Sequence, residues 1–268
     1  MTRSTLILAL AGVLALAASA QAGTVTQALW LMGEDDPGAT AGNAVNATGV
    51  DSSGNGNSLT LYDEWWPVGS KPEEVPANPI LATYVAPGAG AASSLAVSMS
   101  TGDPMYYYAN TVSLGADHGI EMWVRLTNNG QRRDAFWSSG LGIWNPSDQT
   151  INFHLAGTGD LASFNYEDGA WYNLAIVTVG GQTTFYVNGE SKYSFEHSGI
   201  NGGDLTVGGV SGNYSPWDGA IDNVRVFNVD GAFDPMSDLT LSMDIPEPAT
   251  MSLLALGGLA ALIRRKRK

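Results

Sequence analysis

The chain contains no cysteine among its 268 residues. This absence excludes disulfide bonds, thiolate catalysis and metal sites with cysteine ligands. Stability must therefore come from a hydrophobic core, and a chain of this length is long enough to bury one.

Basic residues are scarce outside the two ends. The chain has 12 Lys and Arg against 26 Asp and Glu, and its net charge is −14. Six of the twelve basic residues are Arg3 and the run 264–268, so residues 23–248 carry a charge of about −20. Such a surface repels nucleic acid and anionic lipid and suits divalent cations and neutral polymers. We therefore expect no nucleic acid partner.

Catalytic motifs are missing as well. The three histidines, His118, His154 and His197, lack the paired spacing of His-Glu-x-x-His zinc sites and are more typical of surface or strand positions. There is no Gly-x-Ser-x-Gly motif. Glu121 is the only acid in its strand, which therefore lacks the paired carboxylates of retaining glycoside hydrolases. The sequence predicts that the protein is not an enzyme; a divergent glycan-active enzyme is the alternative.

Long apolar stretches with a helical period are absent from the body of the chain. Residues 120–126 and 183–187 instead alternate apolar side chains on one face, and Asn188-Gly189 is a strong hairpin signal. Asn129-Gly130 is a second expected turn, before the run 135–137. Further strands are expected at residues 28–32, 59–62, 94–98, 106–112, 150–155, 171–179, 205–208 and 220–228. This pattern predicts an all-β sandwich in one domain.

The N-terminal end has the pattern of a secretory signal peptide. Arg3 precedes an apolar run over residues 5–18, and small residues follow at the spacing of a signal peptidase site. Cleavage after Ala20 or after Ala22 fits equally, so the mature chain begins at Gln21 or Gly23. We assign residues 1–22 to the signal peptide and expect an exported body.

The C-terminal end, residues 244–268, resembles the PEP-CTERM sorting signal of Gram-negative bacteria that make extracellular polysaccharide. The tripeptide Pro246, Glu247 and Pro248 precedes an apolar run at 249–263 and a basic tail at 264–268. The two prolines keep the tripeptide extended ahead of a helix. The resemblance implies processing by an exosortase-type membrane enzyme and transient anchoring in the inner membrane. A plain anchor that is never cleaved is the alternative, although 15 apolar residues are short for a permanent span.

Residues 23–243 resemble LamG-like, concanavalin A-like jelly-roll domains. Five pieces occur in the family order, at residues 30–34, 51–57, 171–177, 184–189 and 219–227. The resemblance implies a jelly-roll sandwich of two antiparallel sheets. Residues 64–84 fit none of these pieces and are expected to form an insertion or a long loop.

The same resemblance implies a structural calcium ion that ties the N-terminal segment to the last strand. Asp222 is the expected carboxylate ligand, with Glu34 and Asp51 as partners. Calcium takes six to eight oxygen ligands, which Gly-Asp-Asn loops supply. The alternative is that Asp222 and Asp51 bond the amides of their own turns, and that Glu34 belongs to a solvated acidic loop.

Four tryptophans flanked by turn residues are the candidates for ligand contact, because an exposed indole can stack on a sugar ring. They are Trp65, Trp66, Trp144 and Trp217. Packing in the core is the alternative for each of them. We expect a non-catalytic protein of the cell surface or extracellular matrix that binds a glycan or another matrix component; a purely structural surface protein is a further alternative.

Overall fold

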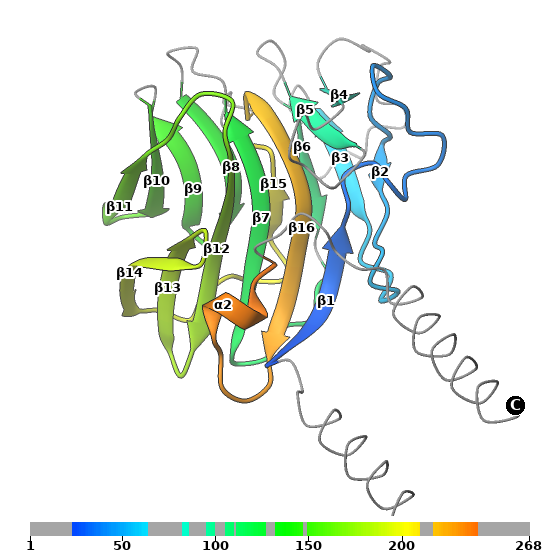
Figure 1. Ribbon diagram of the computed structural model, residues 1–268. Coiled ribbons are helices and arrows are strands. Elements are labelled where there is room, and N and C mark those ends of the chain that lie inside the picture. The colour runs from blue at the N-terminus through cyan, green and yellow to red at the C-terminus, as the bar shows by residue number, and fades with distance from the viewer. Residues whose placement is uncertain are drawn as a thin grey trace, which may run out of the picture.

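The computed structural model describes eight stretches of the chain, residues 23–63, 82–85, 95–99, 105–109, 111–126, 132–146, 149–209 and 217–240. Their strands form two antiparallel sheets that lie face to face (Figure 1). Sheet A consists of β1 Thr24–Trp30, β4 Ala82–Val85, β5 Ala96–Met99, β7 His118–Leu126, β12 Trp171–Val179, β13 Gln182–Val187, β14 Glu190–Glu196 and β16 Gly219–Val229. Sheet B consists of β2 Thr48–Gly49, β3 Leu59–Asp63, β6 Met105–Ala109, β8 Arg132–Ser138, β9 Leu141–Pro146, β10 Thr150–Leu155, β11 Gly159–Asn165 and β15 Leu205–Val207. The predicted all-β sandwich of two antiparallel sheets is confirmed.

The strand order explains why distant parts of the sequence meet. Sheet A runs β14-β13-β12-β7-β16-β5-β4, and sheet B runs β11-β10-β9-β8-β15-β6-β3-β2. β16 pairs with β7 along one edge, while β1 and β5 share its other edge. The first and last strands are thus neighbours, as Figure 1 shows.

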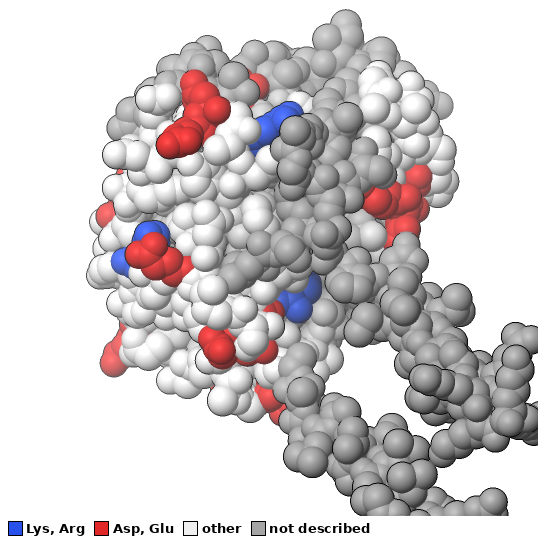
Figure 2. Space-filling view, in the orientation of Figure 1, with Lys and Arg blue, Asp and Glu red and all other residues white. Residues whose placement is uncertain are grey.

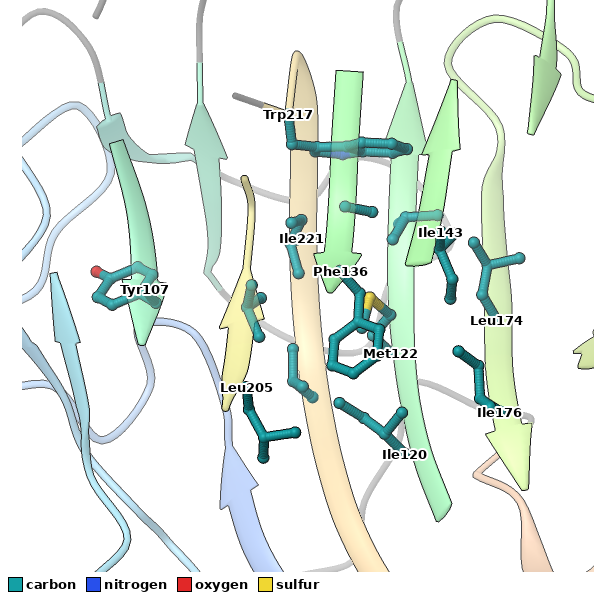
Figure 3. Close-up of a cluster of buried hydrophobic side chains, with 14 of the residues drawn as sticks. Tyr107, Ile120, Met122, Phe136, Ile143, Leu174, Ile176, Leu205, Trp217 and Ile221 are labelled. Atoms are coloured by element: carbon teal, nitrogen blue, oxygen red, sulfur yellow. The ribbon is translucent and has the colours of Figure 1, made fainter. Parts of the chain in front are cut away.

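The hydrophobic core fills the space between the two sheets (Figure 3). On β7 the alternating residues Ile120, Met122, Val124 and Leu126 are buried, as their period of two predicts. Trp217 is fully buried in the same core. The outward faces of the strands carry the polar residues and some aromatic ones. Figure 2 shows acidic side chains spread over one face of the molecule, with few basic ones between them.

Several expected elements are confirmed. β10 and β12 have the predicted bounds, and Asn188-Gly189 forms the turn of the β13–β14 hairpin, with φ of +50° and +77°. These positive φ values are what a tight hairpin turn needs.

One expectation is corrected, and another lies outside the described residues. The turn expected at 129–130 is in that undescribed part of the chain, between β7 of sheet A and β8 of sheet B. The segment expected to be a loop at 64–84 includes the start of β4, which pairs with β5.

A C-terminal strap, residues 234–240, lies against sheet A and contains the short helix α2 Pro235–Asp238. Glu121, only 1% exposed, accepts a hydrogen bond from Thr240 N at 2.8 Å and pairs with Arg225 at 2.5 Å. Trp123 and Asn173 both donate to the main-chain oxygen of Thr240. The strap is therefore held by a buried ion pair and several hydrogen bonds.

Candidate functional site

One continuous row of residues crosses the face of sheet B that points away from the core. Residues directly opposite one another on paired strands share a face. Six strands contribute one residue each, and we call this set the cross-strand row: Tyr108, Thr206, Trp137, Gly142, His154 and Asp160. Their strand neighbours Phe136, Ile143 and Phe153 are fully buried in the core. The row itself therefore points away from the core, although Thr206 within it is only 2% exposed.

The indole of Trp137 lies against the backbone of the neighbouring strand. A Cβ added to Gly142 would come within 2.3 Å of Cε3 of Trp137, so a residue with a side chain would displace the ring. The His154 ring lies beside the indole, with centroids 5.6 Å apart. Trp144 meets His154 edge-on at 6.0 Å and an interplanar angle of 83°. These three rings form an aromatic cluster on the sheet surface.

Asp160 fixes the polar side of this cluster. Its Oδ1 accepts hydrogen bonds from Trp144 Nε1 and His154 Nδ1, both at 2.8 Å, and its Oδ2 accepts one from Asn152 Nδ2 at 2.7 Å. Burial acts to raise the pKa of Asp160, but the hydrogen bonds from His154, Trp144 and Asn152 outweigh it and lower that pKa. The carboxylate thus stays ionised and holds three side chains in place.

The His154 ring is oriented by the same contact. Because the carboxylate of Asp160 accepts from Nδ1, the neutral ring carries its proton there and presents Nε2 as an acceptor. The side chains of His154 and Asp160 are 23% and 36% exposed, so both reach solvent. Flat rings beside fixed acceptors suit a ligand with one apolar face and hydroxyl groups along its edge.

The predicted calcium ligand Asp51 is engaged with backbone amides. Its Oδ1 accepts from Leu29 N and Ser53 N, and its Oδ2 accepts from Asn57 N, at 2.8 to 3.0 Å. Burial raises the pKa of Asp51, and the hydrogen bonds from Ser53, Leu29 and Asn57 together lower it further than burial raises it. Asp51 therefore fastens its loop to the edge of β1.

The other two predicted ligands lie near the place where β16 changes partner. Asp222 is fully buried at a bulge in β16 and accepts from Asn223 N at 2.7 Å. Glu34 follows β1 and accepts a hydrogen bond from Leu95 N at 2.7 Å. Leu95 immediately precedes β5, which pairs with β16 as far as Ile221. Asp51 is on the opposite edge of β1, so the structure does not bring the three together as a group. Among the described residues, no group of three or more His, Cys, Asp and Glu side chains forms a metal site.

The four predicted tryptophans have different outcomes. Trp144 belongs to the aromatic cluster of sheet B. Trp217 is 0% exposed, so the prediction that it contacts a ligand is wrong: it fills the core instead (Figure 3). Trp65 and Trp66 lie outside the described residues, as does the sorting motif Pro246, Glu247 and Pro248.

Sequence reasoning missed Trp137, His154, Asp160 and Asn152 as site residues. Trp137 directly follows the core residues Ala135 and Phe136, so it reads as part of the core. The sequence pattern predicts no strands at β9 and β11, and without them the strand register that joins these residues cannot be derived. The alternation of Asn152 and His154 with the apolar Ile151 and Phe153 was the one signal in the sequence.

Comparisons with known proteins agree with this architecture. Residues 100–230 match the family described as the concanavalin A-like lectin/glucanases superfamily, and residues 244–268 match the PEP-CTERM protein-sorting motif. No curated protein matches the chain in sequence. Both resemblances inferred from the sequence are confirmed.

Two solved structures share the fold at low sequence identity. One is domain 4 of an extracellular arabinanase from Geobacillus stearothermophilus in complex with arabinotriose, with 15% identity, a TM-score of 0.54 and coverage of 82% of this chain and 98% of that one. The other is a sialidase from Trypanosoma rangeli in complex with the inhibitor DANA, with 12% identity, a TM-score of 0.53 and coverage of 85% and 35%. This chain therefore spans about a third of the sialidase.

Among the described residues, no helix is long and apolar enough to span a membrane. The apolar run 249–263 lies outside those residues.

Proposed function

Given a concanavalin A-like domain at residues 100–230 and a PEP-CTERM sorting motif at residues 244–268, we propose that this exported protein binds a glycan without cleaving it. The binding site is the outer face of sheet B, at the cross-strand row. The observation that carries this proposal is the cluster of Trp137, Trp144 and His154 fixed by Asp160.

The chemistry of the cluster favours a sugar over other polymers. An indole stacks on the C–H face of a pyranose or furanose ring, and oriented side-chain acceptors receive its hydroxyl hydrogens. The surplus of acidic residues disfavours anionic polymers. A structural neighbour with arabinotriose bound supports an oligosaccharide ligand by analogy of fold alone. We therefore propose a neutral glycan.

The sorting motif supports a location outside the cytoplasm. We propose that the body is displayed on the surface, or in the extracellular polysaccharide matrix, of a Gram-negative bacterium. An exosortase-type enzyme would process the chain near the motif while the C-terminal run holds it briefly in the inner membrane. The test is the mass of the mature protein: loss of everything after Pro248 supports this route, and an intact chain in the inner membrane contradicts it.

Binding and catalysis are separated by one pair of assays. A glycan array of neutral oligosaccharides, arabinotriose included, is probed with the exported protein, and the bound glycans are then incubated with it and assayed for new reducing ends. We expect binding without release. Release that stops on replacement of a carboxylate would establish the glycan-active enzyme instead, and no response in either assay would establish a purely structural protein.

For calcium, we propose a site that uses Glu34, Asp222 and main-chain carbonyls at the end of β16. Asp51 does not fit, because both of its oxygens already accept from backbone amides. Calcium should raise the melting temperature of the natural protein but not that of Asp222→Asn. The absence of a rise in the natural protein contradicts the proposal.

A further inference from the structure

A cavity of about 430 Å³, open to solvent, lies at one end of the sandwich, apart from the aromatic cluster of sheet B. Three stretches line it: the connection before β7, the turn between β8 and β9, and the loop from Ser198 to Gly203. Its described lining includes His118 and no Lys, Arg, Asp or Glu. The cavity is thus uncharged apart from the imidazole and large enough for one or two sugar rings.

His118 is 4% exposed, and only one of its two ring nitrogens has a partner. Nδ1 lies 2.8 Å from the main-chain oxygen of Gly115. Because a carbonyl oxygen only accepts, Nδ1 must carry the proton, and Nε2 of the neutral ring is left as an acceptor without a donor. A buried acceptor without a donor is costly, so a missing donor is expected.

The nearest hydroxyl group cannot supply that donor. Thr178 Oγ1 lies on the same side of Gly199 as His118 Nε2. A Cβ added to Gly199 would come within 2.2 Å of Thr178 Oγ1 and 2.5 Å of His118 Nε2. Thr183 Oγ1 donates to the main-chain oxygen of His197, so the hydrogen of Thr178 is used on Thr183. The donor for Nε2 must therefore come from outside these residues.

We propose that this cavity binds a single neutral sugar residue, one of whose hydroxyl groups donates to His118 Nε2. Val112 and Ile200 supply apolar walls, and Asn201 has an amide NH₂ group that bonds no described residue. This site deepens the proposed glycan binding by adding a second position, which recognises one sugar and not a chain. The cavity loop touches one end of the cross-strand row, since Tyr108 donates to the main-chain oxygen of Gly203.

The test uses the free hexoses glucose, galactose and mannose, with glucuronate as a charged control. Amide signals of Gly199 and Asn201 are followed by NMR in the full-length protein. At least one hexose should shift them with a Kd of about 1–10 mM, while glucuronate should not. If no hexose shifts them at 50 mM (about fivefold above that range), only water satisfies Nε2 and the proposal is wrong.

Three variants locate the site. His118→Phe removes the acceptor, and Ser198→Trp blocks the exposed rim while leaving His118 intact; each should weaken hexose binding at least tenfold. Ser191→Trp on β14 is the matched surface control and should bind as the natural protein does. Unchanged binding in Ser198→Trp would overturn the assignment even if His118→Phe fails to fold.

Failure of this site is distinguishable from failure of the proposed function. Trp144→Ala should weaken binding to the polysaccharide selected on the array at least tenfold but keep the hexose shifts at Gly199. His118→Phe should keep polysaccharide binding but lose the hexose shifts at Gly199. Loss of both activities in both variants would contradict the existence of two positions.

A second inference concerns the carboxylate of Asp238 in the C-terminal strap. Asp238 is 7% exposed, and among the described residues its two oxygens accept only from the main-chain amides of Gly23, at 3.1 Å, and Asp234, at 2.7 Å. Arg225 bonds the main-chain oxygen of Asp238, not its carboxylate. Buried aspartates are rarely left without a positive partner.

The structure assigns that partner to the mature N-terminus. Cleavage after Ala22 turns Gly23 N into an ammonium group 3.1 Å from Asp238 Oδ1, whereas cleavage after Ala20 leaves it a neutral amide. Gly23 is also held tightly, because a Cβ there would lie 2.5 Å from Ala232 O. We infer that the mature chain begins at Gly23 and that its charge fastens the strap.

N-terminal sequencing of the exported protein should give Gly23; Gln21 would overturn the inference. The ion pair is tested with two otherwise full-length chains that begin at Gly23 and at Gln21, each with and without Asp238→Asn. The substitution should lower the melting temperature by about 3 °C more in the chain that begins at Gly23. Equal effects in both chains would show that no ion pair forms.

Discussion

The Trp137 indole occupies the space that a side chain on Gly142 would fill, 2.3 Å from the position of its Cβ. One glycine in β9 therefore lets an indole from β8 lie against the sheet. The aromatic cluster depends on this contact, because His154 follows Gly142 in the register and lies beside the same ring.

Gly142→Ala should displace the Trp137 ring and weaken glycan binding about tenfold, since a misplaced ring loses its stacking contact. The measurement is the affinity for the array-selected glycan, with the tryptophan emission spectrum as a report on the ring. Gly49→Ala on β2 of the same sheet, where a Cβ would come no nearer than 3.4 Å to Leu59, is the control for the loss of a strand glycine. An unchanged affinity in Gly142→Ala would show that the ring position is irrelevant.

Asp160 should give part of the stability a defined pH dependence. Its folded pKa is lowered, so its contribution is complete above the unfolded value of about 3.9 and is lost as the pH falls through the folded value. The stability difference between the natural protein and Asp160→Asn should shrink as the pH falls below about 4. Urea unfolding between about pH 5 and about pH 3 measures it, and a difference that grows over this acidic range would contradict the assignment.

Asp51→Ala should destabilise the fold by about 1–3 kcal/mol, because three backbone amides lose their acceptor. The exposed Asp230→Ala is a suitable control and should have little effect. Thermal unfolding in the presence of EGTA isolates this hydrogen-bonding role from any contribution of calcium. Equal stabilities of the two variants would contradict it.

Glu121→Ala should cost about 3–5 kcal/mol, because it leaves the largely buried Arg225 without its carboxylate partner. Lys192 and Glu190 form a pair in which the Glu190 side chain is 76% exposed, so Glu190→Ala should cost much less, within about 0.5 kcal/mol. Chemical denaturation of both variants makes the comparison. Similar losses would mean that the strap contributes nothing through this pair.

Alternation and turn signals predicted the sandwich well where a strand has one buried face and one outward face. β10 is such a strand, β12 has the predicted bounds although residues 173–178 are all buried, and the Asn188-Gly189 turn sets the start of β14. The fold class, the core of β7 and the two family resemblances could therefore be read from single segments of sequence.

The site could not be predicted in the same way, because it depends on pairing between strands. Trp137, Gly142, His154 and Asp160 meet only through the register of four strands, and a slip of one residue would turn each to the other face. Trp217 shows the opposite error: neighbouring turn residues suggested exposure, yet the ring is fully buried.

Glycan binding at the aromatic cluster of sheet B is tested by isothermal titration of the array-selected glycan into four proteins: the natural protein, Trp137→Ala, Trp144→Ala and Tyr193→Ala. Tyr193 on β14 is 40% exposed and serves as the control. Each tryptophan variant should lose at least tenfold in affinity, which corresponds to about 1.4 kcal/mol, and Tyr193→Ala should lose none. Equal affinities in all four proteins would contradict the account.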